Sequence, residues 1–104
     1  MKASLFALAL GLGLLAAPAL GADTKILIQN FTFTPTHLEV KSGTTVIFKN
    51  EDDIPHSVVA VDGSFHSRAL DTDDQVSLTL TKPGDFAYYC GLHPHMQGKI
   101  TVLP

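Results

Sequence analysis

The sequence predicts an all-β protein, and the architecture we expect is a Greek-key β-sandwich. Apolar and polar residues alternate in several short segments, as they do in strands that have one buried face. Pairs of turn-forming residues that include Gly separate these segments, and no segment carries the apolar stripe of an amphipathic helix. With 104 residues, the chain has room for a single domain.

The expected strands are justified by their residue patterns, taken from the N-terminus onward. Ile26 and Ile28 mark the first strand, and we expect Phe31 and Phe33 to continue it. Further strands are expected, with antiparallel pairing, at residues 38–40, 44–49, 75–81, 86–90 and 100–102. The acidic run at residues 51–53 is expected to be a solvated turn, with a recognition role as the less favoured alternative.

The N-terminus has the pattern of a secretory signal peptide, which we expect to occupy residues 1–22. Lys2 precedes an uncharged apolar stretch at residues 3–17, and small residues follow it. This stretch is shorter than the ~20 apolar residues that span a bilayer, which disfavours a membrane anchor. We expect cleavage after Ala22, with Gly21 as the alternative, and export of residues 23–104 to the periplasm.

The composition excludes several classes of protein. The formal net charge is −3 and Lys and Arg do not cluster, which disfavours a nucleic-acid binder. The chain has one Cys, so it cannot form an internal disulfide. Small exported domains usually need a covalent or metal crosslink, and a bound metal ion is the obvious one here.

The strongest functional signal is the segment 88–99. Cys90 is expected to end a strand on its inward face, and the turn after it brings His93 and then Met96 back toward the same point. His56 is the best candidate for a fourth donor, because a loop after an earlier strand can meet this loop at one end of a sandwich. Two His, one Cys and a weak axial Met select copper of the blue electron-transfer kind. Zinc would prefer four firm ligands.

Other interpretations of these residues are weaker. Cys90 taken alone is compatible with an inert buried thiol, and Met96 taken alone with core filler. His95 is the one competitor of His93, but it would place two ligands on adjacent residues whose side chains diverge. The two remaining histidines, His37 and His66, are not expected to be ligands.

The whole segment 23–104 resembles the cupredoxins, the small blue copper proteins. The spacing Cys90-x-x-His93-x-x-Met96 is most similar to that of the amicyanins within this family. Further matching motifs are Ser42-Gly43, Pro55-His56 and residues 82–90. The resemblance implies that one copper ion has His56, Cys90 and His93 as equatorial ligands and Met96 as its axial ligand.

Two positions depart from the family pattern. Ser57 stands where relatives usually have the Asn that ties the two ligand loops together, although a hydroxyl can still form a hydrogen bond. His95 occupies a place that is aromatic and apolar in amicyanins. Ser57 therefore puts the rigidity of the loops in question, and His95 adds a titratable group beside them.

The resemblance implies a periplasmic type 1 copper electron carrier that shuttles single electrons. Its donor would be a dehydrogenase and its acceptor a c-type cytochrome, and the protein would be a monomer. Protein ligands would fill the coordination sphere, so we expect no enzymatic activity. The alternative is a periplasmic copper-binding chaperone or storage protein. An enzymatic copper domain would need a second centre with several more histidines, and the chain has 5 in total.

Overall fold

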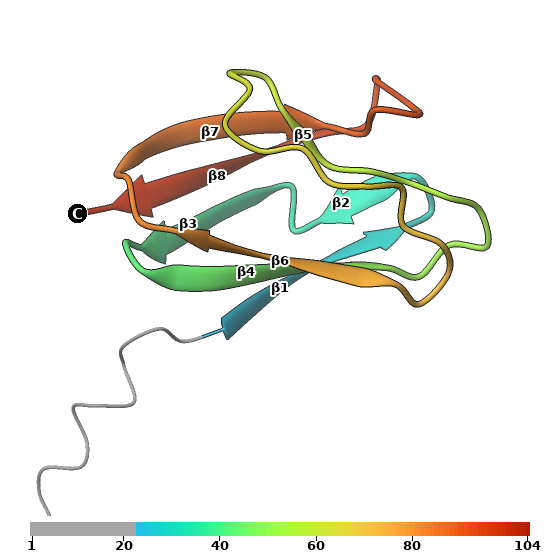
Figure 1. Ribbon diagram of the computed structural model, residues 1–104, viewed down its shortest axis with the longest axis horizontal. Helices are drawn as coiled ribbons and strands as arrows, with labels where there is room; N and C mark the ends of the chain where they lie inside the picture. The colour runs from blue at the N-terminus through green and yellow to red at the C-terminus, as the bar shows by residue number, and fades with distance from the viewer. Residues whose placement is uncertain (1–22) are drawn as a thin grey trace, which may run out of the picture.

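The computed structural model describes residues 23–104, which form a sandwich of two four-stranded sheets (Figure 1). The first sheet has the strand order β2-β1-β4-β6 and the second has the order β3-β8-β7-β5. The strands are β1 (Asp23–Gln29), β2 (Thr32–Thr34), β3 (His37–Lys41), β4 (Thr44–Asn50), β5 (Val59–Ala60), β6 (Gln75–Leu80), β7 (Gly84–Tyr89) and β8 (Gln97–Leu103). The predicted signal peptide, residues 1–22, lies outside the described residues.

The pairing of the strands corrects the expectation of a purely antiparallel sandwich. Strands β1 and β4 run parallel, and so do β3 and β8, whereas the other pairs are antiparallel. The reason is that the chain crosses from one sheet to the other at every step from β2 to β7. Strands distant in the sequence therefore become neighbours, and in two of these pairs the two strands run in the same direction.

The first predicted strand is in fact two strands joined by a tight turn. Asn30 has a φ of 53° and Phe31 a φ of 59°, so two successive residues are left-handed and the chain reverses there. Phe33 consequently lies on β2, which pairs antiparallel with β1, and not on a continuation of β1. Neither turn residue is a glycine, so the alternation of apolar residues looked continuous in the sequence.

The core consists of the inward-facing residues of both sheets. In β4, buried positions alternate with half-buried ones along the strand. Three aromatic rings meet edge to face between the sheets, with ring centroids 4.8 Å apart for Phe33 and Tyr88, 5.3 Å for Phe48 and Tyr88, and 6.2 Å for Phe33 and Phe48. Such pairs contribute ~0.5–1.5 kcal/mol each beyond the burial of their area.

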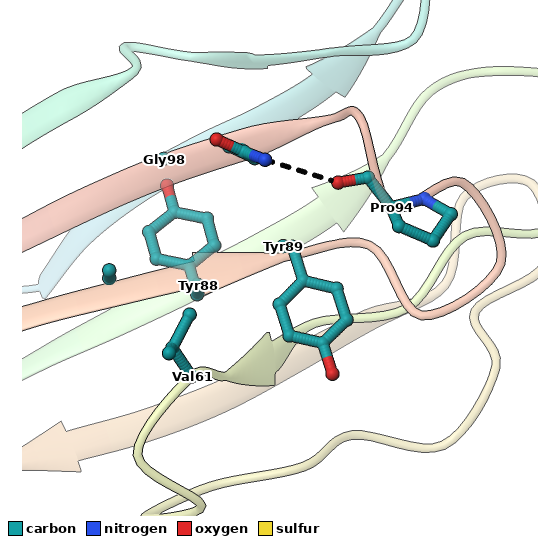
Figure 2. A pocket seen from close by; sticks show the side chains of 7 residues that line it. Val61, Tyr88, Tyr89, Pro94 and Gly98 are labelled. Carbon is teal, nitrogen blue, oxygen red and sulfur yellow. Dashed lines mark hydrogen bonds between the residues drawn. The ribbon is translucent and has the colours of Figure 1, made fainter.

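Tyr88 connects this core to the strand that follows the predicted metal loop. Its ring lies over Gly98 of the neighbouring strand, and a β-carbon at Gly98 would overlap the phenol (Figure 2). Burial raises the pKa of Tyr88 above its ordinary value. The close contact fixes the start of β8 against β7, and these two strands carry the loop between them.

The described residues contain no helix with the length and apolar character needed to cross a membrane.

Candidate metal centre

Two links between strands meet at one end of the sandwich. One is the segment between β4 and β5, residues 51–58, and the other is the loop between β7 and β8, residues 90–96 (Figure 1). Strands from both sheets thus supply one site, since β4 belongs to the first sheet and β7 and β8 to the second.

Three of the predicted donor residues converge at this end. The Cys90 Sγ lies 3.6 Å from the His56 Nδ1 and 3.8 Å from the His93 Nδ1. All three donor atoms lie within 4.8 Å of one another. Cys90 and His56 are fully buried, whereas His93 is half-buried. The distant pair His56 and Cys90 is therefore brought together as the sequence predicted.

Local hydrogen bonds shape the β7–β8 loop. The His93 N–H donates to the Cys90 carbonyl at 3.2 Å, and the Met96 N–H donates to the His93 carbonyl at 2.9 Å. The Cys90 N–H then donates to the Met96 carbonyl at 3.0 Å, which closes the loop. Met96 is 3% exposed and belongs to the same buried cluster as Cys90. The three residues of the Cys-x-x-His-x-x-Met pattern are therefore the ones whose backbone hydrogen bonds close the loop.

The backbone around His56 is held by a partner far along the chain. The His56 N–H donates to the Leu70 carbonyl at 3.1 Å, and the Leu70 N–H returns a bond of 2.7 Å to the His56 carbonyl. The Asn50 side chain adds bonds to the carbonyls of Ile54 and Leu70, of 2.8 and 2.9 Å. The backbone of His56 is therefore held in place by Leu70, a residue outside its own segment.

Asp52 orients the ring of His56. The His56 Nε2 lies 2.8 Å from the Asp52 Oδ2. Donation of the Nε2 proton to this carboxylate leaves a lone pair on the Nδ1, the ring nitrogen that lies near the Cys90 Sγ. Partial burial acts to raise the pKa of Asp52, but hydrogen bonds from the N–H groups of Phe31 and Asn30, together with His56, outweigh it and lower the pKa.

The role of Asp52 was missed at the level of the sequence, where a solvated turn was the favoured expectation for residues 51–53. The available signal was a carboxylate four residues before a candidate His ligand. Metal-binding His residues commonly donate their second ring N–H to a carboxylate.

Ser57 joins the two ligand segments directly. Its hydroxyl accepts a hydrogen bond of 2.9 Å from the Gly91 N–H, and its own N–H lies 3.3 Å from the Cys90 Sγ. A β-carbon at Gly91 would come within 2.8 Å of the Ser57 Oγ. Ser57 therefore ties the two ligand segments together at a point where their backbones lie close to each other.

The other histidines stay outside the group of donor atoms. The His95 ring is exposed and its centroid lies 6.4 Å from that of His93. His37 is exposed, and its Nε2 lies 3.1 Å from the Thr101 hydroxyl. His66 is exposed as well. Among residues 23–104, the convergent group contains His93 and not His95.

The donor spacing fits a first-row transition metal ion. Donor atoms about 2.0–2.3 Å from such an ion lie roughly 3.3–3.8 Å from one another in trigonal or tetrahedral geometry. Both sulfur–nitrogen distances, 3.6 and 3.8 Å, fall in or at the edge of this range. A thiolate with two imidazoles selects a soft or borderline ion, and copper suits this set.

A surface cavity of about 310 Å³ lies beside the centre but does not include it. It is lined by residues of β7 and β8 and their surroundings, and Figure 2 shows Tyr89 and Val61 at its wall. Pro94 also lines it, and its carbonyl accepts a hydrogen bond of 3.4 Å from the Gln97 side chain. None of the converging donor residues lines this cavity, so the chemistry of the site is located elsewhere.

A two-sheet sandwich with one Cys and two His converging at its end defines a small type 1 copper protein. Comparison with known proteins agrees with this class, because a model of the cupredoxin-like domain matches residues 3–102. The chain therefore belongs to the cupredoxin family, whose type 1 sites typically combine two His, one Cys and one Met.

The chain is similar to two groups of named relatives. It is 34% identical to amicyanin from Paracoccus denitrificans over 78% of this chain and 67% of the relative. It is 35% identical to chloroplastic plastocyanin from Oryza sativa subsp. indica over 80% of this chain and 60% of the relative. The structure of an oxidised amicyanin variant superimposes with a TM-score of 0.74 and 29% identity, over 77% of this chain and 81% of that one.

Proposed function

We propose that this protein is a periplasmic type 1 copper electron carrier in which His56, Cys90, His93 and Met96 bind one copper ion. The observation that carries the proposal is the convergence of one sulfur and two nitrogen donors within 4.8 Å at the end of the sandwich. Bound copper supplies reversible one-electron chemistry at this site. The chain supplies the geometry of the site, and we assign different roles to its buried ligands and to His93.

The buried ligands hold the site in one arrangement. Cys90 and His56 are fully enclosed. The Asp52 carboxylate accepts a hydrogen bond from the His56 ring, and the Ser57 N–H lies within hydrogen-bond distance of the Cys90 sulfur. Met96 is buried in the same cluster as Cys90, and its thioether would supply a weak fourth ligand to copper. A framework that cannot relax differently for the two oxidation states needs little rearrangement when one electron moves.

His93 is the ligand nearest to solvent, so we assign electron exchange to its exposed edge. Its neighbour Leu92 is 51% exposed and Pro94 is exposed as well. The apolar residues around the imidazole suit brief encounters with other redox proteins. Such complexes bury little surface area and separate quickly. The similarity to amicyanin supports a dehydrogenase as the electron donor and a c-type cytochrome as the acceptor.

The remaining parts of the proposal concern export, assembly and catalysis. Residues 1–22 act as a signal peptide, the domain of residues 23–104 is released into the periplasm, and it works as a monomer. It is a carrier and not an enzyme, because four protein ligands leave copper no open position for a substrate.

Titration of the metal-free protein with Cu(II) tests this proposal. An electron carrier develops a strong visible band near ~600 nm from thiolate-to-copper charge transfer at one equivalent of copper. A chaperone or storage protein binds Cu(I) and shows no such band. Stopped-flow mixing of the reduced protein with an oxidised c-type cytochrome then measures electron transfer. The proposal predicts second-order oxidation with copper retained, and release of copper without oxidation would contradict it.

A further inference from the structure

Phe31 packs against both imidazoles of the metal centre. Its ring centroid lies 5.3 Å from that of His56 and 5.1 Å from that of His93, with interplanar angles of 86° and 82°. The two imidazole centroids are 5.1 Å apart. The three rings thus form one edge-to-face cluster, and Phe31 is its only member that the donor chemistry does not require. Edge-to-face contacts favour particular ring orientations.

The backbone that presents this ring is strained and needs outside support. Asn30 and Phe31 have φ values of 53° and 59°, a left-handed conformation that residues other than Gly adopt at a cost. Phe31 is also 45% exposed, so burial of its own surface is incomplete. A large apolar residue in such a position has neither a favourable backbone nor a full core contact to explain it.

The support comes from the carboxylate that also holds the metal centre. The Asn30 N–H donates to the Asp52 Oδ1 at 2.7 Å, and the Phe31 N–H donates to the Asp52 Oδ2 at 3.0 Å. The same Oδ2 accepts the bond of 2.8 Å from the His56 Nε2. One side chain therefore couples the turn that carries Phe31 to the buried imidazole.

We propose that Phe31 is a positioning residue of the metal centre, held by Asp52, whose ring fixes both imidazole planes and shields them from water. This inference rests in part on the copper-carrier function proposed above. Removal of the ring would let water reach the His56–Asp52 bond and the gap between the imidazoles. Water near the centre would stabilise the more highly charged Cu(II) state, because solvent access sets the dielectric around a metal and thereby its reduction potential.

Three variants separate positioning from folding. Phe31→Gly removes the ring, keeps the backbone N–H that Asp52 accepts, and suits a positive φ, so it should not weaken the fold. Phe31→Tyr keeps the ring. Leu103→Ala is the matched control, because Leu103 is a 40% exposed apolar residue at the far end of β8. Thermal unfolding of each full-length variant verifies that the fold is intact.

The first readout uses the metal-free protein. Exchange of the His56 Nε2 proton with solvent is measured by NMR, and we expect it to be about tenfold faster in the Gly variant. The Tyr variant and the Leu103 control should exchange like the wild-type protein. Equal exchange rates in the Gly variant and the wild-type protein would overturn the inference, as would a Tyr variant that behaves like the Gly variant.

The second readout is the reduction potential of the copper-loaded proteins, measured by equilibrium titration. We expect a lower potential in the Gly variant, and wild-type values in the Tyr variant and the control. An unchanged potential in the Gly variant would contradict the shielding role. If the wild-type protein developed no blue band, the proposed electron-carrier function would fail, whereas the exchange measurement would still decide the role of Phe31.

Discussion

The two segments that supply the metal centre are built in different ways. His56 lies in a segment whose hydrogen bonds reach residues elsewhere in the fold, such as Leu70, and its ring is fixed by Asp52. The loop from Cys90 to Met96 is closed by hydrogen bonds among its own residues. The His56 ring is fully buried, while His93 is half-buried.

The difference assigns a separate task to each segment. The segment around His56 acts as a rigid anchor, because moving it would disturb partners in several parts of the sandwich. The loop around His93 is closed by hydrogen bonds among its own residues, is tied to the first segment through Ser57, and presents one ligand to solvent. A carrier needs both properties, since fixed ligands keep rearrangement small and an accessible ligand allows contact with partners.

The largest effect should come from the sulfur that both segments share. Cys90→Ser removes the thiolate that faces both imidazoles, so the visible band should disappear completely. Absorption spectra of copper-loaded wild-type and variant proteins measure this. Because Cys90 is the one Cys of the chain, a band that survived the substitution could not come from a thiolate and would remove the basis of the comparison.

The anchor segment should be sensitive to the loss of Asp52. Asp52→Asn leaves one acceptor oxygen for three N–H donors, from Asn30, Phe31 and His56. We expect copper affinity to fall by about 10–100-fold, as is typical when a carboxylate partner of a ligand His is lost. Competition titration with a chelator measures the affinity.

The matched control for this prediction is Asp53→Asn. It makes the same change of charge at the exposed neighbouring residue. It should leave copper affinity close to that of the wild-type protein. Equal losses in the two variants would indicate a general electrostatic effect and would argue against a fixed anchor.

The loop segment should respond through the reduction potential and not through loss of copper. Met96→Leu conserves volume in the buried cluster, and such exchanges usually cost less than ~1.5 kcal/mol. Loss of the thioether removes a donor that stabilises Cu(II), so we expect copper to be retained and the potential to rise. Cyclic voltammetry tests this. An unchanged potential would show that Met96 does not contact the ion.

The tie between the segments should have a smaller effect. Ser57→Ala leaves the Gly91 N–H without its acceptor, and we expect the free energy of unfolding of the metal-free protein to fall by about 1 kcal/mol. Denaturant unfolding measures the loss. Ser77→Ala, at an exposed residue of β6, provides a control. A variant at Ser57 that unfolded like this control would mean that the two segments are held together by other contacts.

The smallest effect should be a difference in acid stability. The pKa of Asp52 is lowered in the folded protein, so its stabilisation is complete above the unfolded-state pKa of about 4. This stabilisation is lost as the pH falls through the folded pKa. The melting temperature of metal-free wild-type protein should therefore fall more steeply with acid than that of the Asp52→Asn variant. If the melting temperatures of the two proteins fell in parallel with pH, protonation of Asp52 would not be linked to stability.

The main features of the fold and the centre could be predicted because they depend on local patterns. Alternation of apolar residues predicts strands wherever one face is buried, as in β4 and β6. The close spacing of Cys90, His93 and Met96 places them on one loop whatever the rest of the chain does. The sequence-distant His56 was predicted because its loop follows an earlier strand and can meet the Cys90 loop at one end of a sandwich, and the resemblance to the cupredoxins implied the same residue.

The features that were missed depend on contacts between distant residues. The turn at Asn30 and Phe31 is stable because Asp52 accepts both of its N–H groups, and no local pattern contains that information. Asp52 looked like one more solvated charge because its three donors are supplied by the fold. The parallel pairs arise in the same way, from the order in which strands enter the two sheets.

A crystal structure of the copper-loaded protein, with copper located by its anomalous scattering, tests the central claim most directly. We predict a single ion bound by the Nδ1 atoms of His56 and His93 and the Sγ of Cys90, with the Met96 sulfur on its axis. The same density map would contradict the account if copper occupied another place on the chain, or if the Cys90 sulfur were not bonded to it.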